Sequence, residues 1–210
     1  MKFDITYKCT LFFFGLWLSV NAQNKQLQAF TLEDGLPQSQ VYAITQDDTG
    51  YLWLGTQGGG LARFDGSNFT VYDDTKGLVS NYINAIQSKN DTLYIGTKQG
   101  LSVKIKQKFV HISIPEINKI ITFNNQVFLL TVKGVYTVSE GLLVNKLNLH
   151  SEIDDVIVND LLFYRDQFLM ATQYGLWEFD GLLSKPQHVR KLQSGDFKSL
   201  VGFKNKIVAS

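Results

Sequence analysis

The chain alternates short apolar segments with polar turns, and one such segment recurs along its length. The hexapeptide YLWLGT at 51–56 returns as TLYIGT at 92–97, and weaker copies end at Thr131, Thr172 and Ser210. The residues that end these segments are 41, 34, 41 and 38 positions apart. A period near forty residues indicates one supersecondary unit that is copied and packed against itself.

Each unit is predicted to contain four short strands. In the second unit these are 83–88, 92–97, 101–105 and 108–113. The second strand is apolar almost throughout, as expected of a strand packed on both faces, whereas the third and fourth alternate between apolar and polar residues. No stretch longer than a turn has helical periodicity. The pattern therefore predicts an all-β chain.

Turn residues and glycines recur at fixed places in the units. Asn, Asp and Gly tolerate the positive φ that tight hairpins need, and they precede each repeated segment. A glycine followed by an aliphatic residue comes three or four positions after it. We predict a structural role for the conserved places in this pattern, which are occupied by Asp48, Gly50, Trp53, Gly55, Gly60, Gly96, Gly100, Gly134 and Gly175.

Four antiparallel strands in about forty residues are typical of a β-propeller blade. One blade cannot cover its own apolar faces, so blades stack around an axis and cover one another. We expect about four and a half blades, a fragment of a larger ring, with the residues before the first blade, 29–32, forming an outer strand. The alternative is a β-solenoid or a sandwich. The expected blades span 40–75, 82–113, 117–149, 157–193 and, in part, 196–210.

The first 22 residues have the features of a secretory signal peptide. Lys2 and Lys8 precede the apolar run at 11–20, which is short for a membrane span, and small residues end at Ala22. We expect cleavage there, export to the periplasm and a mature propeller segment at 23–210. An uncleaved anchor is the alternative. Cys9, the one cysteine, lies before the apolar run and would leave the mature chain without disulfides.

Composition limits the classes of partner. The formal net charge is +1, so no basic excess points to nucleic acid. The histidines at 111, 150 and 188 lack the spacing of metal ligands, and no phosphate-binding loop or zinc-protease motif is present. We expect no metal and no cofactor.

The first two units carry the motifs of a known family. A lead at Gly35–Val41, a turn at Asp47–Gly50, the strand Tyr51–Thr56 and the stretch Gly60–Gly66 resemble the two-component regulator propeller repeat. A second lead lies at Gly77–Ile83. The resemblance is specific over about residues 30–105, and the later units keep only the strand pattern.

The resemblance implies a periplasmic sensor region of a Bacteroidetes-type histidine kinase or hybrid two-component protein. Such propellers usually have seven blades, or two rings of seven, and precede a further β-domain, a transmembrane helix and an output module. Relatives often sense polysaccharide fragments. The expected partners are an oligosaccharide or another small ligand, the remaining blades, a downstream membrane and kinase module, and a second copy in a homodimer.

Two other classes of function remain open. A propeller enzyme, such as a glycosidase or lyase, would need paired carboxylates toward the channel, and Asp160 is the acidic residue expected on an inner strand. The stretch at 47–53 resembles the Asp-box hairpin of sialidases, which is structural. A sialidase also needs an arginine triad and a tyrosine nucleophile, whereas Arg63, Arg165 and Arg190 are each expected at a strand or turn position. A secreted scaffold that binds other proteins is the third class.

The two leads are the best candidates for a ligand site. They run from an outer strand to the next inner strand, so their side chains are expected near one end of the channel, where loops of all blades converge. Amides, hydroxyls and a ring suit a sugar. For Ser39 and Asn81, capping of strand ends is the competing role. The predicted ligand-binding residues are Gln38, Ser39, Gln40, Asn81, Tyr82 and Asn84.

Overall fold

A computed structural model describes residues 28–139, 142, 144–147, 155–165, 167–182, 185–203 and 206–210. The predicted signal peptide, 1–22, lies outside the described residues. The chain divides at Phe30 into two units, and the strands belong to the second, Thr31–Ser210. No helix in the described part of the chain is long and apolar enough to span a membrane.

The strands form four four-stranded antiparallel sheets and one strand pair, each in simple meander order. Sheet 1 contains β1 (Val41–Gln46), β2 (Leu52–Thr56), β3 (Leu61–Phe64) and β4 (Phe69–Tyr72). Sheet 2 contains β5 (Ile83–Lys89), β6 (Thr92–Thr97), β7 (Gly100–Ile105) and β8 (Lys108–Ile112).

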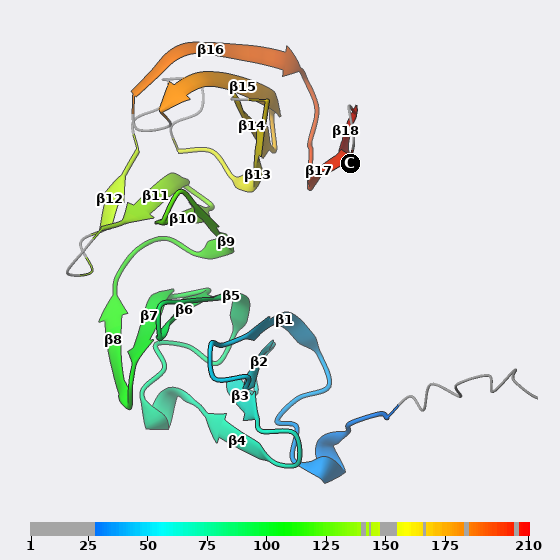
Figure 1. Cartoon of the computed structure of the whole chain (residues 1–210), viewed down its shortest axis with the longest axis vertical. Coiled ribbons are helices and arrows are strands. Elements are labelled where there is room, and N and C mark those ends of the chain that lie inside the picture. Colours follow the sequence, from blue (N-terminus) through cyan, green and yellow to red (C-terminus); the bar gives the residue numbers. More distant parts are fainter. Residues whose placement is uncertain are drawn as a thin grey trace, which may run out of the picture. The chain divides into compact units, whose positions relative to one another are not determined.

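The later sheets repeat this order. Sheet 3 contains β9 (Ile117–Phe123), β10 (Gln126–Thr131), β11 (Gly134–Val138) and β12 (Val144–Lys146). Sheet 4 contains β13 (Val158–Tyr164), β14 (Gln167–Thr172), β15 (Gly175–Leu182) and β16 (Lys185–Gln193), and the pair contains β17 (Leu200–Phe203) and β18 (Lys206–Ala209). The prediction of about four and a half propeller blades is confirmed (Figure 1).

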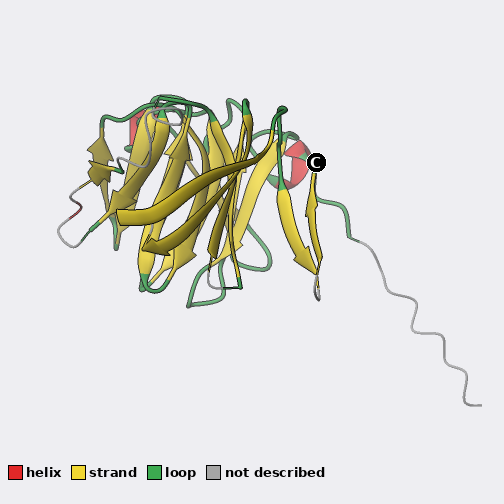
Figure 2. Ribbon diagram, turned by 90° about the horizontal axis from the view of Figure 1, so that it is seen from above, coloured by secondary structure: helices red, strands yellow, loops and turns green. Residues whose placement is uncertain are grey.

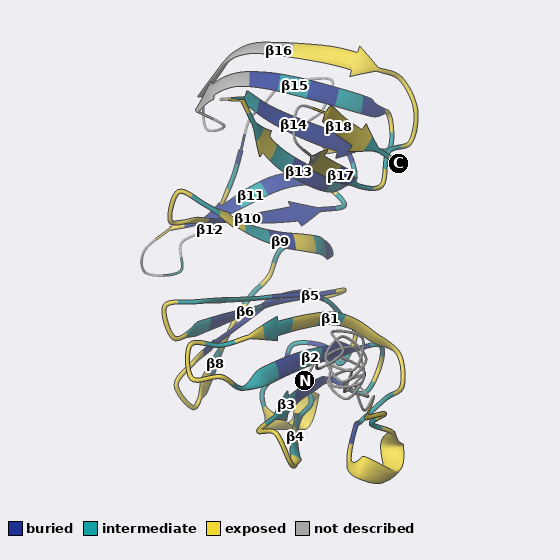
Figure 3. Ribbon diagram, turned by 45° about the vertical axis from the view of Figure 1, so that its right-hand side comes forward, coloured by how far each residue is buried: buried dark blue, intermediate teal, exposed yellow. Residues whose placement is uncertain are grey.

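The sheets stack in chain order through their first strands. Each of β1, β5, β9 and β13 contacts the first strand of the next sheet. Figure 2 shows the strands of successive sheets standing side by side. Three strands, β7, β10 and β14, are buried along nearly their whole length, and β10 and β14 are dark blue in Figure 3.

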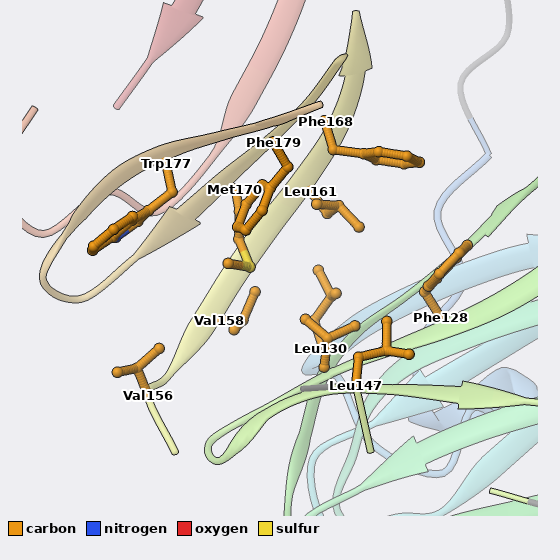
Figure 4. Close-up of a cluster of buried hydrophobic side chains, with 11 residues drawn as sticks. Phe128, Leu130, Leu147, Val156, Val158, Leu161, Phe168, Met170, Trp177 and Phe179 are labelled. Atoms are coloured by element: carbon orange, nitrogen blue, oxygen red, sulfur yellow. The ribbon is translucent and has the colours of Figure 1, made fainter. Parts of the chain in front are cut away.

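An apolar cluster fills each interface between sheets. Figure 4 shows the cluster between sheets 3 and 4, where Phe128 and Leu130 approach Val158, Leu161 and other side chains of sheet 4. Similar clusters lie between sheets 1 and 2, between sheets 2 and 3, and between sheet 4 and the β17–β18 pair. Burial between sheets, rather than within one sheet, supplies the hydrophobic core.

Glycines allow the first two interfaces to close. A Cβ added to Gly55 would lie 2.5 Å from Cγ2 of Ile83 and 2.9 Å from Cδ1 of Ile86. A Cβ added to Gly96 would lie 2.7 Å from Cγ2 of Ile117. These distances are far below van der Waals contact, so the inner strand of one sheet packs directly on the backbone of the sheet before it.

The recurring threonines close the turn between the second and third strands. Thr56 donates its hydroxyl hydrogen to the carbonyl of Gly60 at 2.7 Å, and Thr97 makes the same bond to Gly100 at 2.9 Å. Thr131 and Thr172 repeat it in sheets 3 and 4. All four side chains are buried, which explains why this position recurs so regularly in the sequence.

The prediction of an outer strand at 29–32 is wrong. Thr31 instead caps a short 3-10 helix, η2 (Leu32–Asp34), whose Asp34 carboxylate accepts the backbone N–H of Thr31 at 2.7 Å. Gly35 ends the helix in the left-handed conformation, with φ 98°. A capping box with a terminal glycine stabilises a local turn, and it prevails over the apolar pattern that favoured a strand.

We expect Gly55→Ala to lower the free energy of unfolding by about 2 kcal/mol, because the added methyl group overpacks the interface between sheets 1 and 2. Thermal unfolding of the purified chain measures the loss. Ile83→Ala removes the clashing Cγ2, so its cost should be smaller in the Gly55→Ala background than in the wild type. Additive costs would show that the close approach is not what makes glycine necessary.

Candidate ligand-binding site

The two ends of the sheets differ in the loops that they carry. The leads before β1 and β5 lie at the same end as the turns between second and third strands, which we call the lead end. The turns between first and second strands lie at the opposite end, called here the hairpin end. The backbone N–H groups of Gly58 and Gly60 donate to the carbonyl of Asn81 at 3.0 and 3.1 Å, so the second lead packs on the turn of sheet 1.

In the first lead, two of the predicted ligand residues bond to each other. Gln38 Oε1 accepts both the backbone N–H of Ser39, at 2.7 Å, and its hydroxyl hydrogen, at 3.1 Å. The carbonyl of Gln40 accepts the N–H of Gln57 at 3.1 Å, while its side chain is exposed. Local hydrogen bonds therefore occupy Oε1 of Gln38 and the hydroxyl of Ser39.

In the second lead, Asn81 has the capping geometry. Its Oδ1 accepts the N–H of Asp74 at 2.9 Å, at the start of the 3-10 helix η3 (Asp74–Lys76). Its carbonyl accepts the two glycine N–H groups described above. This arrangement matches the structural alternative that was weighed against ligand binding for Asn81.

Asn84 links three sheets. Its Nδ2 donates to the carbonyl of Ile117 and to Oε1 of Glu116, both at 3.1 Å. Its Oδ1 accepts from Nε2 of Gln57 at 3.2 Å. Both Nδ2 and Oδ1 of Asn84 therefore form hydrogen bonds to protein groups of the neighbouring sheets.

The bond from Asn84 belongs to a repeated link between sheets. Asn118 donates to the carbonyl of Val158 at 3.3 Å, and Asn159 donates to that of Phe197 at 2.6 Å. Each of the three asparagines occupies a β-bulge just after the start of an inner strand. In sheet 1 the bulge residue is Tyr42, and Gln57 Nε2 makes the corresponding bond to Ile83 at 2.7 Å. The sequence reasoning missed this link.

Tyr82 is the predicted residue that presents a ring to solvent. It is 47% exposed, and the Lys98 ammonium lies 4.9 Å from the ring centroid. The backbone of Gly58 lies behind the ring, since a Cβ there would be 3.6 Å from it. The Tyr82 N–H donates to Ser80 Oγ at 3.2 Å and its carbonyl accepts from Lys98, so the residue is held in place. The exposed Lys98 ammonium lies over the ring, so the two side chains together form a cation–aromatic pair at the surface.

Two cavities among the described residues lie at the hairpin end. One of about 390 Å³ lies between sheets 2 and 3, beside Tyr94 and Asn125. Another of about 270 Å³ lies between sheets 1 and 2, beside Trp53 and Lys104. Both hollows are therefore at the opposite end of the strands from the predicted ligand-binding residues.

Asp47, rather than Asp48, organises the hairpin between β1 and β2. Its Oδ1 accepts the N–H groups of Thr49 and Tyr51, each at 3.0 Å, and its Oδ2 accepts the indole N–H of Trp53 at 2.7 Å. Asp48 is exposed, with one long contact from the Asp91 N–H at 3.4 Å. The assignment of the structural aspartate to Asp48 is therefore wrong by one position, because the carboxylate must point inward to reach the indole.

The acidic residue and the histidine considered as catalytic or metal-binding candidates contact other protein groups. Asp160, 4% exposed, accepts from Lys119 Nζ at 2.7 Å and from the Leu161 and Leu200 N–H groups at 2.8 and 3.0 Å. His111 is exposed, with Nδ1 3.4 Å from Ser102 Oγ. His150 and the His188 side chain lie outside the described residues. Within the part of the chain that is described, no group of three metal-ligating residues occurs.

Comparison with known proteins agrees with the motifs. A family model described as two component regulator propeller matches residues 35–58. The histidine kinase P4 of Formosa agariphila is 48% identical over 59 residues, a match that covers 27% of this chain and 4% of that kinase. The resemblance of the first units to two-component regulator propeller repeats is confirmed.

Solved structures support the fold. The extracellular domain of a putative one-component system from B. thetaiotaomicron superposes with a TM-score of 0.63 at 23% identity, over 83% of this chain and 27% of that one. The computationally designed protein Ika8 gives 0.62 at 17% identity, over 82% and 55%. The chain thus spans about a quarter of the natural relative's domain, and the likeness concerns the fold.

We expect Asp47→Asn to destabilise the chain by about 2 kcal/mol, because a neutral amide cannot accept all the hydrogen bonds that the carboxylate accepts from Tyr51, Trp53, and the N–H and hydroxyl groups of Thr49. Burial opposes ionisation of Asp47, but bonds from Thr49, Trp53 and Tyr51 outweigh it and hold the pKa of its carboxyl below the usual value. This stabilisation is complete above about pH 4 and is lost as pH falls through the folded-state pKa.

Urea unfolding at several pH values measures both effects. The Asp47→Asn variant should be less stable at neutral pH and should lose less of its stability on acidification than the wild type. Asp48→Asn is the matched control and should change stability little. Equal losses in the two variants would contradict the assignment of the turn to Asp47.

Proposed function

We propose that the chain is an exported sensor propeller that binds a small ligand and does not catalyse a reaction. The observation that carries this proposal is the fixed, half-exposed ring of Tyr82 beside Lys98, at the end where the leads meet the turns. Loops from successive blades converge at such an end. The family-model match at 35–58 and the kinase relative support a place in a two-component signalling protein.

The ligand that this surface suits is an oligosaccharide. A sugar ring would pack against the exposed part of the Tyr82 ring, and its hydroxyl groups would bond to polar groups such as the Gln40 amide and the Lys98 ammonium over the ring. Of the six predicted ligand-binding residues, Tyr82 and Gln40 are proposed to contact the oligosaccharide with their side chains. Gln38, Ser39, Asn81 and Asn84 would then act by holding the leads in place.

The bonding of Asp160 supports binding over catalysis. An acid or base catalyst needs a carboxylate that reaches the reacting group. Asp160 is instead buried and bonded by three donors from its own and two neighbouring sheets. The Asp160 carboxylate, which was the candidate for a catalytic acid or base, therefore has a structural role between sheets in this proposal.

Export and signalling complete the proposal. The apolar run at 11–20 is proposed as the core of a signal peptide that directs the chain to the periplasm. The complete protein is proposed to pair this propeller with further blades and with a membrane-spanning kinase module. Ligand occupancy would reach that module through the packing between sheets or through contacts in a homodimer.

We expect Tyr82→Ala to weaken binding of an oligosaccharide by about tenfold or more, since one aromatic stacking contact contributes on the order of 1.4 kcal/mol. Calorimetric titration with a panel of neutral oligosaccharides identifies a probe, and the variant is then compared with the wild type. Tyr174→Ala, which removes another exposed tyrosine of a lead-end turn in sheet 4, is the matched control.

Stability separates the two kinds of lead residue. Asn84→Ala should lower the melting temperature because it breaks the link between sheets, whereas Tyr82→Ala should leave it close to the wild-type value. Binding that is unchanged in Tyr82→Ala would contradict the proposed surface. Release of shorter products from the bound oligosaccharide would contradict the non-catalytic role.

A further inference from the structure

A cavity of about 270 Å³ lies between sheets 1 and 2 at the hairpin end. Two aromatic side chains, Tyr51 and Trp53, and three cationic ones, Arg63, Lys104 and Lys106, line it. This cavity is separate from the lead-end surface around Tyr82, because the hairpin turns and the leads lie at opposite ends of the strands.

Two of the cations approach the cavity from opposite sheets. Arg63 lies on β3, and its guanidinium carbon is 4.5 Å from the centroid of the Tyr51 ring. Lys104 lies on β7 and is only 9% exposed, with its ammonium 5.3 Å from the Trp53 ring. Burial first, and the charge of Arg63 second, lower the pKa of Lys104, and Asp47 offsets part of this effect. The two positive charges therefore oppose each other in a partly desolvated space.

Two carboxylates, those of Asp47 and Asp91, line the same cavity as the three cations, and Asp47 offsets part of the positive charge at Lys104. Among the described residues, Arg63, Lys104 and Lys106 have no carboxylate oxygen within 4.0 Å. Asp47 borders the cavity, but both its oxygens are bonded within its own hairpin. Lys104 donates to the carbonyl of Lys106. The Nε of Arg63 is buried and has no hydrogen-bond partner in the described part of the chain.

The cations are not a general feature of the blades. The register of β2 with β3 places Arg63 opposite Trp53, and the corresponding positions in sheets 2 and 3 are Val103 and Thr137. By the same register, the place of Lys104 is taken by Phe64, Val138 and Phe179 in the other sheets. A buried ammonium thus replaces an apolar core residue in sheet 2. Packing alone would favour the apolar residue, because burying an unpaired charge is costly.

We propose that this cavity binds an oxyanion carried on a ring or another apolar body. A carboxylate between Arg63 and Lys104 would accept hydrogen bonds from terminal N–H groups of the guanidinium and from the remaining N–H groups of the ammonium. Such charge-assisted hydrogen bonds are strong in a partly buried site. The rings of Tyr51 and Trp53 would contact the body of the ligand, and the exposed Lys106 would complete the positive rim.

Calorimetric titration at low salt tests the site, with glucuronate as the carboxylate probe, glucose as its neutral match and inorganic phosphate as an anion without a ring. The wild-type chain should bind glucuronate and not glucose. Trp53 emission should change with the same saturation curve. If glucuronate binds more tightly than phosphate, the rings of Tyr51 and Trp53 contribute to the affinity. If the two anions bind equally, the affinity comes from the positive charges, which also supports an oxyanion site.

Lys104→Met should weaken glucuronate binding by about tenfold or more, because it removes one charge-assisted contact. The variant should fold at least as well as the wild type, since methionine suits a position that is apolar in the other sheets. Lys106→Asn, at an exposed position, should weaken binding by a smaller factor and does not depend on the core. Lys108→Met, an exposed lysine outside the cavity, is the matched control and should bind like the wild type.

The proposal fails if neither anion binds at millimolar concentration. It also fails if Lys104→Met and Lys106→Asn both bind glucuronate as the wild type does, or if glucose binds equally well. Tyr82→Ala should leave glucuronate binding intact. That result would distinguish a test of this cavity from a test of the lead-end surface, because Tyr82→Ala is expected to weaken binding of neutral oligosaccharides only.

Discussion

The contact between one sheet and the next is the interaction on which the rest of this structure depends. At the first two interfaces an aliphatic side chain of the inner strand, Ile83 or Ile117, packs onto the backbone of the preceding sheet at a glycine, and an apolar cluster fills every interface. No single four-stranded sheet could bury its second strand in this way. The repeat in the sequence follows from this requirement, because each interface needs small or apolar residues at equivalent places, such as Gly55, Gly96, Leu130 and Ala171.

The same constraint determines what the polar residues near the interfaces do. Asn84, Asn118 and Asn159 each occupy a bulge and donate to a carbonyl of the following sheet or its approach. Asp160 and Lys119 form a further link between sheets. These groups satisfy backbone atoms that stacking would otherwise leave unpaired. What remains for recognition is a smaller set of side chains that packing does not use: the Tyr82 ring at one end, and the cations around Trp53 at the other.

Aliphatic side chains are more exposed in the outer sheets of the stack than in the sheets that a neighbour covers. Ile86, Ile120 and Leu161 are 6–8% exposed where the preceding sheet covers them, whereas Ile44, at the corresponding place in β1, is 62% exposed. Val208 of β18 is 60% exposed. In a quasi-one-dimensional stack, stability is a sum of sheets and interfaces. The outer elements are therefore expected to open more readily than the middle ones.

The sequence was sufficient for the fold because the repeat is set by local chemistry. The glycine turns, the buried threonines and the apolar second strands can all be recognised without a structure. The site was less predictable. Asp47 and Asp48 are adjacent, and only the direction of the strand decides which one reaches Trp53. The sequence does contain a signal for the link between sheets, because the spacing of the repeat recurs in Asn84, Asn118 and Asn159. Their β-bulges and their hydrogen bonds to the next sheet could not be predicted, because both depend on how the sheets stack. Lys104 looked like an ordinary lysine of an alternating strand.

The dependence of each sheet on its neighbours is tested most directly by native-state hydrogen exchange of the full chain, resolved by strand. Amides of β6 and β10, in sheets covered on both faces, should be the most protected, and those of β1 and the β17–β18 pair should exchange fastest. Uniform protection from β1 to β18 would contradict the account, because it would mean that the sheets hold together without relying on the interfaces between them.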